Sequence, residues 1–349
     1  RHGSGWWSQS RWGAWPSRWL LNDAATTEIY TRSLLVALPI SAFLVAPRRV
    51  VMSASFLLPV LVVAAAVLLA QAMAPMLQPR ARARALVIVG IGAATTWLWL
   101  VVAVAMGGLA EQVALERWIG WCPRLSLVDG HVLAWQGILG AALLASSSFG
   151  LLKAVRAQLC LRRELPHIDG SGVLVVDSPA PGAFAVPGRR GGVVVTQGMI
   201  ATLDADEQQV LWAHETAHLR NNHHRFLILS DLFVGVLPLL SPVRRQLDFA
   251  IERWADEDSA ARTGDRRLVA RAIAKAGLAS MGGGETRLAM ANSSVPARVE
   301  AMLSAPRSAN PVTHLALGAV GALGALAIGG STIQLHHLLA LARHVCTGG

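Results

Sequence analysis

The chain has 349 residues, of which 53% are hydrophobic and 15% charged, whereas soluble domains carry about 25% charged residues. This composition excludes a disordered chain and is atypical of a soluble cytosolic enzyme. The apolar residues form long runs, which indicates a polytopic membrane protein. A formal net charge of +10 would suit nucleic acid, but the basic residues cluster beside the apolar runs. We therefore interpret them as topology markers and expect no direct nucleic-acid binding.

The N-terminal segment 1–51 is rich in tryptophan and does not begin with methionine. Two interpretations remain open. The segment is either an interfacial anchor or additional short membrane segment, or it is non-native sequence upstream of a start at Met52. We favour the second, and no later step depends on it.

Four apolar runs are long enough to cross about 30 Å of hydrocarbon as helices. They cover approximately 52–76, 86–108, 132–152 and 314–333. We expect three transmembrane helices in 52–152, a cytosolic domain in 153–313, and a last transmembrane helix with a short tail in 314–349.

The orientation follows from two basic clusters, because short cytoplasmic loops concentrate Arg and Lys. These clusters place the domain 153–313 in the cytosol and the loop 110–131 outside, and only Arg48 and Arg49 fit this poorly. The cluster residues are Arg80, Arg82, Arg84, Lys153, Arg156, Arg162 and Arg163.

The polar domain opens with three short strand patterns, 173–178, 183–186 and 193–196. The last of these could be an edge strand that pairs with an extended substrate, or an internal strand. Asp204 and Glu207 then form a capping-box pattern, which predicts a helix over about 205–221.

That helix carries the sequence His214-Glu215-Thr-Ala-His218. Residues four apart lie on one helical face, so both imidazoles can bind one metal ion with Glu215 beside them. Zinc suits two histidines and a carboxylate, and it keeps a fourth position open. The best source of that carboxylate is Glu252. Asp256, one turn later, could hold the ring N–H of a ligand histidine, and Asp258 is an alternative.

Two further features near the motif are ambiguous. His223 and His224 are interpreted as surface residues or as supporting residues, because the helix should end there. The apolar segment 226–240 is too short to be a clear span and suits an interfacial or half-inserted helix. If it crossed the membrane, His218 and Glu252 would lie on opposite sides and the metal site could not form.

The motif segment 210–223, preceded by 191–203 and followed by 252–256, resembles the gluzincin membrane peptidases. Two branches compete, the BlaR/MecR-type peptidases and the branch of HtpX and the CAAX prenyl proteases. The predicted order, three membrane spans, a cytosolic domain and one further span, resembles that of the BlaR/MecR-type peptidases. The segment 295–303 resembles the arginine-bearing segment at the end of such peptidase domains. The sequence departs from the sensing branch at 221–224 and 254–255, and it leaves no room after 349 for an extracellular sensor domain.

The resemblance implies that His214, His218 and Glu252 bind one Zn²⁺ ion, that Glu215 is the general base, and that Asp256 and Arg298 support the site. It implies a mainly α membrane protein with about four transmembrane helices and an inserted α+β gluzincin-like zinc peptidase domain. Arg298, His223 and His224 remain candidates for stabilising the oxyanion.

The expected function is a membrane-embedded zinc-dependent endopeptidase that cleaves a protein or peptide substrate at the cytosolic face of the lipid bilayer. The BlaR/MecR resemblance implies signalling through cleavage of a cytosolic transcriptional repressor. The alternatives are an HtpX-like quality-control protease for membrane proteins and a non-catalytic membrane signalling scaffold.

Overall fold

The structure is a computed structural model. It describes residues 54–73, 76–110, 134–164, 168, 172–188, 191–281 and 285–305, with 315, 318 and 322 as isolated positions. The predicted N-terminal segment 1–51 lies outside the described residues, as do 111–131 of the predicted loop and most of the predicted fourth span.

Three apolar helices precede the polar domain: α2 (Ala54–Met73), α3 (Pro79–Ala110) and α5 (Ala134–Glu164). Within the described residues, the segments Pro79–Val102 and Gly137–Glu164 are long and apolar enough to cross a membrane. Both helices extend beyond the predicted spans, so the basic clusters lie in helical turns rather than in loops as predicted. A run of apolar residues marks only the part of a helix that suits lipid, and the polar turns at its ends leave no such mark.

A small mixed sheet follows, made of β1 (Val173–Val176), β2 (Ala183–Val186) and β3 (Gly192–Thr196). The order is β1-β3-β2, with β3 parallel to β1 and antiparallel to β2. The interpretation of 193–196 as an edge strand was therefore wrong. Every residue of β3 is buried, which agrees with its run of β-branched valines.

Two helices lead from β3 to the motif: α6 (Gln197–Thr202) and α7 (Ala205–Arg220). The Asp204 side chain accepts a hydrogen bond from the Glu207 backbone N–H, and the Glu207 side chain accepts one from the Asp204 N–H. The predicted capping box is confirmed, and it fixes where α7 begins.

The chain then reverses through α8 (His223–Val236), the 3₁₀ turn η5 (Pro238–Leu240) and α9 (Ser241–Thr263). The predicted segment 226–240 is thus divided, since α8 ends before Pro238, which cannot continue the hydrogen-bond pattern. At 14 residues, α8 would extend only about 21 Å, which is short of a bilayer core. It packs closely on α3 and α5, where the glycines Gly150 and Gly235 lie in contact.

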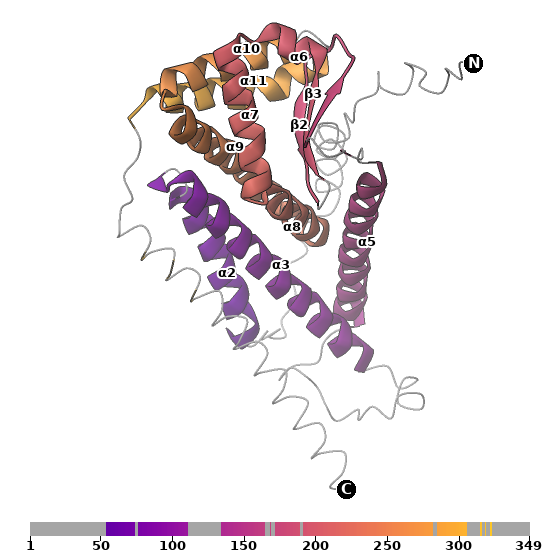
Figure 1. Cartoon of the computed structure of the whole chain (residues 1–349). Helices are drawn as coiled ribbons and strands as arrows, with labels where there is room; N and C mark the ends of the chain where they lie inside the picture. The colour runs from indigo at the N-terminus through magenta and orange to yellow at the C-terminus, as the bar shows by residue number, and fades with distance from the viewer. Residues whose placement is uncertain are drawn as a thin grey trace, which may run out of the picture.

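The remaining helices are α10 (Arg266–Met281) and α11 (Glu285–Leu303), which pack on each other above α9 (Figure 1). One buried core joins the apolar and polar parts of the molecule. It includes Leu86 from α3, Phe233 from α8, and Leu247, Ile251 and Trp254 from α9. This packing holds α9 against both α3 and α7 and so determines where the face of α9 that carries Glu252 lies.

Candidate metal centre

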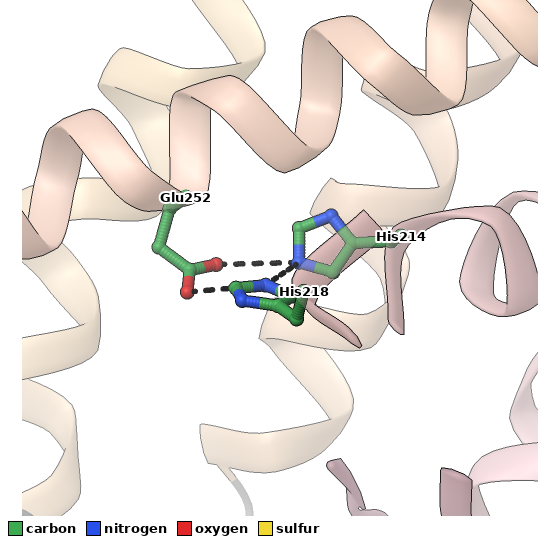
Figure 2. Close-up of side chains that lie close together, drawn as sticks. All are labelled: His214, His218 and Glu252. Carbon is green, nitrogen blue, oxygen red and sulfur yellow. Dashed lines mark hydrogen bonds and ion pairs between the residues drawn. The ribbon is translucent and has the colours of Figure 1, made fainter. Parts of the chain in front are cut away.

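Three side chains from two helices meet at one point (Figure 2). The Nε2 atoms of His214 and His218 on α7 lie 3.1 Å apart. Glu252 on α9 places Oε2 3.4 Å from Nε2 of His214 and Oε1 3.7 Å from Nε2 of His218. One ligand atom from each residue lies within 4.8 Å of the others. This set of two imidazole nitrogens and one carboxylate oxygen fits zinc by its chemistry.

The reversal through α8 and η5 explains how Glu252 reaches the histidines. Because η5 turns the chain back, α9 passes beside α7, and Glu252 lies on the same side of the molecule as His218. The side chains remain partly accessible, with exposed fractions of 13% for His214, 16% for His218 and 35% for Glu252. A solvent molecule or a substrate can therefore approach the cluster from the Glu252 side.

A second layer of polar groups holds His214 and Glu252. The Nδ1 atom of His214 lies 3.2 Å from Oδ1 of Asp256, whose side chain is fully buried. Arg298 from α11 donates from Nε and Nη2 to the two Asp256 oxygens at 2.9 and 2.7 Å. Its Nη1 lies 3.0 Å from Oε2 of Glu252. With Nδ1–H donated to Asp256, His214 has Nε2 free to face the cluster.

Burial and charge set the protonation of the ligand groups in opposite directions. Burial lowers the pKa of His214, but hydrogen bonds to Asp256 and Glu252 outweigh this and raise it to about 10. Burial lowers the pKa of His218 to about 4. Burial raises the pKa of Glu252, but Arg298 and the histidines reverse this and bring it well below its usual value. Without a bound metal ion, Glu252 and Asp256 thus stabilise a positive charge on His214, and a metal cation that bound there would take the place of that proton.

Glu215 lies beside the cluster on α7 and is 8% exposed. Burial raises its pKa to about 7, with further contributions from the nearby charges of His214, Glu252 and Arg298. A carboxyl group with a pKa near neutrality can both accept and release a proton, which is the requirement for a general base.

The structure brings together all of the residues singled out in the sequence: His214, Glu215, His218, Glu252, Asp256 and Arg298. The alternative in which Asp258 replaces Asp256 was wrong. Asp258 instead accepts hydrogen bonds from Arg220 at 2.6 Å and Asn221 at 2.8 Å, and it also contacts Arg80. One turn of α9 carries Glu252 and Asp256 on the same face, and Asp258 points to the other side.

Sequence reasoning missed the burial of His223, which is 1% exposed, so the interpretation of this residue as a surface residue was wrong. Its Nδ1 lies 3.0 Å from Nδ1 of His218. The pair Asn221-Asn222 was the available signal, since asparagine tolerates the left-handed backbone conformation that starts a new helix. Asn222 has φ 54°.

Comparisons with known proteins agree with this geometry. Residues 150–244 match the family model described as Peptidase family M48. The chain is 33% identical over 79 residues to a protease HtpX homolog of Listeria monocytogenes serotype 4a, covering 22% of this chain and 26% of that protein. It is 32% identical over 88 residues to a protease HtpX homolog of Dictyoglomus thermophilum, covering 25% of this chain and 29% of that protein. No solved structure shows a significant match.

The matched stretches span only about a quarter of the length of these relatives. The family match ends at residue 244, inside the first turn of α9, so Glu252 and Asp256 lie beyond the matched region. The comparisons support a metallopeptidase domain of the M48 kind around α7, and the geometry of α9 extends the candidate site beyond the matched region.

Proposed function

We propose that this chain is a membrane-bound zinc metalloendopeptidase. The observation that carries the proposal is the cluster in which one ligand atom each from His214, His218 and Glu252 lie within 4.8 Å of one another. The similarity to Peptidase family M48 supports the same chemistry. In this proposal His214, His218 and Glu252 hold one Zn²⁺ ion, and Asp256 and Arg298 support the ligands.

A bound zinc ion supplies Lewis-acid chemistry, since it polarises a carbonyl group and acidifies a water molecule. Glu215 takes a proton from the attacking water and delivers it to the leaving amine. Asp256 accepts the Nδ1–H of His214 and so keeps that ring oriented, while Arg298 neutralises the buried carboxylates. Arg298 lies 3.0 Å from Glu252, and it is our candidate for stabilising the oxyanion.

The sheet offers a place for the substrate. Among the described strands, β2 pairs only with β3 and forms an edge of the sheet, and β2 also contacts α7. An extended peptide that added to β2 as another strand would run past the motif helix. We therefore assign the substrate edge to β2 in place of the predicted 193–196.

The membrane location rests on α3 and α5. Both contain segments long and apolar enough to cross a bilayer. Ile138 and Phe149 on α5 are 71% and 70% exposed, which suits contact with lipid better than contact with water. We propose a multi-pass protein of the cell membrane with the peptidase domain in the cytoplasm, and we retain the division into 1–51, 52–152, 153–313 and 314–349.

The relatives named as HtpX homologs fit the alternative of an HtpX-like quality-control protease for membrane proteins comparably well. The proposal of a signalling function, with a transcriptional repressor as the substrate, rests only on the order in which the predicted membrane spans and the peptidase domain follow one another along the chain.

Glu215→Gln tests the proposal most directly. Purified parent protein should hold one zinc per chain by elemental analysis and should degrade fluorescein-labelled casein. Glu215→Gln should keep the zinc and lose cleavage by at least about 100-fold, whereas Glu252→Gln should lose most of the zinc. Equal cleavage by Glu215→Gln and the parent would refute the peptidase mechanism. Zinc without any cleavage by the parent would favour the non-catalytic scaffold.

A further inference from the structure

His223 lies behind His218, on the far side of its ring from the cluster. Its Nδ1 is 3.0 Å from Nδ1 of His218, whereas the cluster is formed at Nε2 of His218. The His223 ring also packs against Trp254 and Phe226, with ring centroids 4.7 and 6.4 Å apart. His223 is therefore placed to act on His218 and not to bind the metal itself.

The break between α7 and α8 creates this placement. Asn221 ends α7, and Asn222 is the only described non-glycine residue with a positive φ. Because Asn222 adopts the left-handed conformation, the chain turns and His223 begins α8 directly beside the last turn of α7. If α7 continued without this turn, residue 223 would lie further along the helix and would not be beside the His218 ring.

The protons between the two rings can be assigned by elimination. A neutral imidazole has one N–H donor and one nitrogen acceptor. If His218 offers Nε2 to a metal ion, its proton lies on Nδ1 and must be donated. Among the described residues, Nδ1 of His223 is the acceptor that lies within hydrogen-bond distance of it, so the proton of His223 lies on Nε2.

We propose that His223 is a positioning residue that fixes the tautomer and the ring orientation of His218 by accepting its Nδ1–H. This inference rests on the proposed zinc site. His223 would serve His218 as Asp256 serves His214, with a neutral acceptor in place of a charged one. Each ligand histidine of α7 then has its own partner.

Packing alone does not explain an imidazole at this position. The Nε2 atom of His223 is buried and has no hydrogen-bond partner among the described residues. A buried unpaired polar atom destabilises a fold, and an apolar side chain of similar size would fill the same space without it. The acceptor at Nδ1 is the feature that only a polar side chain provides.

The variants His223→Leu and His223→Asn separate the effect of the hydrogen-bond acceptor on zinc binding from the effect of packing. Leucine fills the space and has no acceptor, whereas Oδ1 of asparagine occupies the position of Nδ1. The control is His224→Leu on the same turn, since the charges nearest His224 are those of Arg225 and Arg162 and not those of the ligands. The measured quantities are the zinc dissociation constant, by competition with a chromophoric chelator, and the thermal midpoint of the zinc-free protein.

His223→Leu should weaken zinc binding by about 10–100-fold, the usual effect of losing a partner of a ligand histidine. His223→Asn should bind within about threefold of the parent, as should His224→Leu. The zinc-free thermal midpoint of His223→Leu should not fall below that of the parent, since leucine removes the unpaired Nε2 atom. Equal zinc affinity of His223→Leu and the parent would overturn the role of His223 and leave the zinc site standing. Failure of His223→Asn to restore affinity would also overturn it. A parent that binds no zinc would overturn the proposed function together with this inference.

Discussion

Arg298 binds two carboxylates beside the candidate metal centre. Its guanidinium bonds both oxygens of Asp256 and lies 3.0 Å from Glu252. Asp256 is fully buried, and Arg298 is 13% exposed. The charge of Arg298 also lowers the pKa of Asp256 against the burial that would raise it. Replacing Arg298 by methionine keeps an unbranched side chain that can pack in the same place and removes the charge.

Breaking a buried ion pair from one side costs about 3–5 kcal/mol, because an uncompensated charge stays buried. In a domain of 150–250 residues, about 1 kcal/mol corresponds to about 2–4 °C in the melting temperature. Arg298→Met should therefore lower the midpoint of the zinc-free protein in detergent by about 6–20 °C. The midpoint of Arg298→Lys should lie between those of the parent and Arg298→Met, because lysine keeps the charge but cannot form the two-point contact with Asp256.

Arg266 is the matched control, because it also joins α9 to α11. It contacts the partly exposed Glu257 and donates to the backbone carbonyls of Ala301 and Met302. Partly exposed pairs contribute about 0–1 kcal/mol, so Arg266→Met should shift the midpoint less. Adding Asp256→Asn to Arg298→Met removes the stranded charge and should recover at least half of the loss. A loss for Arg298→Met no larger than that for Arg266→Met would refute this reasoning.

Four further substitutions test other parts of the fold, the first three by thermal unfolding in detergent and the last by hydrogen exchange. Gly150→Ala would place a Cβ 2.1 Å from the Gly235 carbonyl oxygen and should cost about 1–3 kcal/mol by separating α5 from α8. Gly92→Ala, whose added Cβ would meet nothing within 4 Å, should leave the stability unchanged or raise it. An equal loss of stability for Gly92→Ala and Gly150→Ala would contradict the close packing of α5 on α8. Burial raises the pKa of Glu207, but Lys275 and its other partners lower it to about 2 from 4.5. Glu207→Gln should therefore lose about 1–3 kcal/mol at pH 7, and this loss should vanish as the pH falls from 4.5 towards 2, where the parent carboxylate is protonated. A loss that persists at pH 2 would contradict that assignment. Asp258→Asn should speed hydrogen exchange at the first turns of α3, and unchanged exchange would exclude a stabilising contact there.

The sequence predicted that His214, His218 and Glu252 lie together, because the patterns that indicate this are local. His214 and His218 need only the 3.6-residue helical period, and the capping box marks where their helix begins. Glu252 and Asp256 again share one helical face. Bringing the two helices together needed only that the chain reverse between them, and it does so through the 14-residue helix α8 and the turn that begins at Pro238.

The failures concern contacts between distant parts of the chain. The sheet order depends on which strands pair, and short valine-rich strands do not specify this from their own residues. The position of His223 beside His218 depends on one left-handed residue, Asn222. The contact between Arg80 and Asp258 joins positions 178 apart in sequence, and no periodicity links such residues.

Arg80 and Arg84 show why the basic residues of α3 are more than markers of topology. Both guanidinium groups lie 5.7 Å from the centre of the Trp254 ring, and the His223 ring packs on the same tryptophan at 4.7 Å. Arg80 also contacts Asp258, which binds the end of α7 through Arg220. Moving positive charge to neighbouring positions would satisfy the rule for membrane orientation but would lose these cation–π and ionic contacts. The residues predicted from the sequence to orient α3 in a membrane thus also contact α9, one of the two helices that carry the candidate metal ligands.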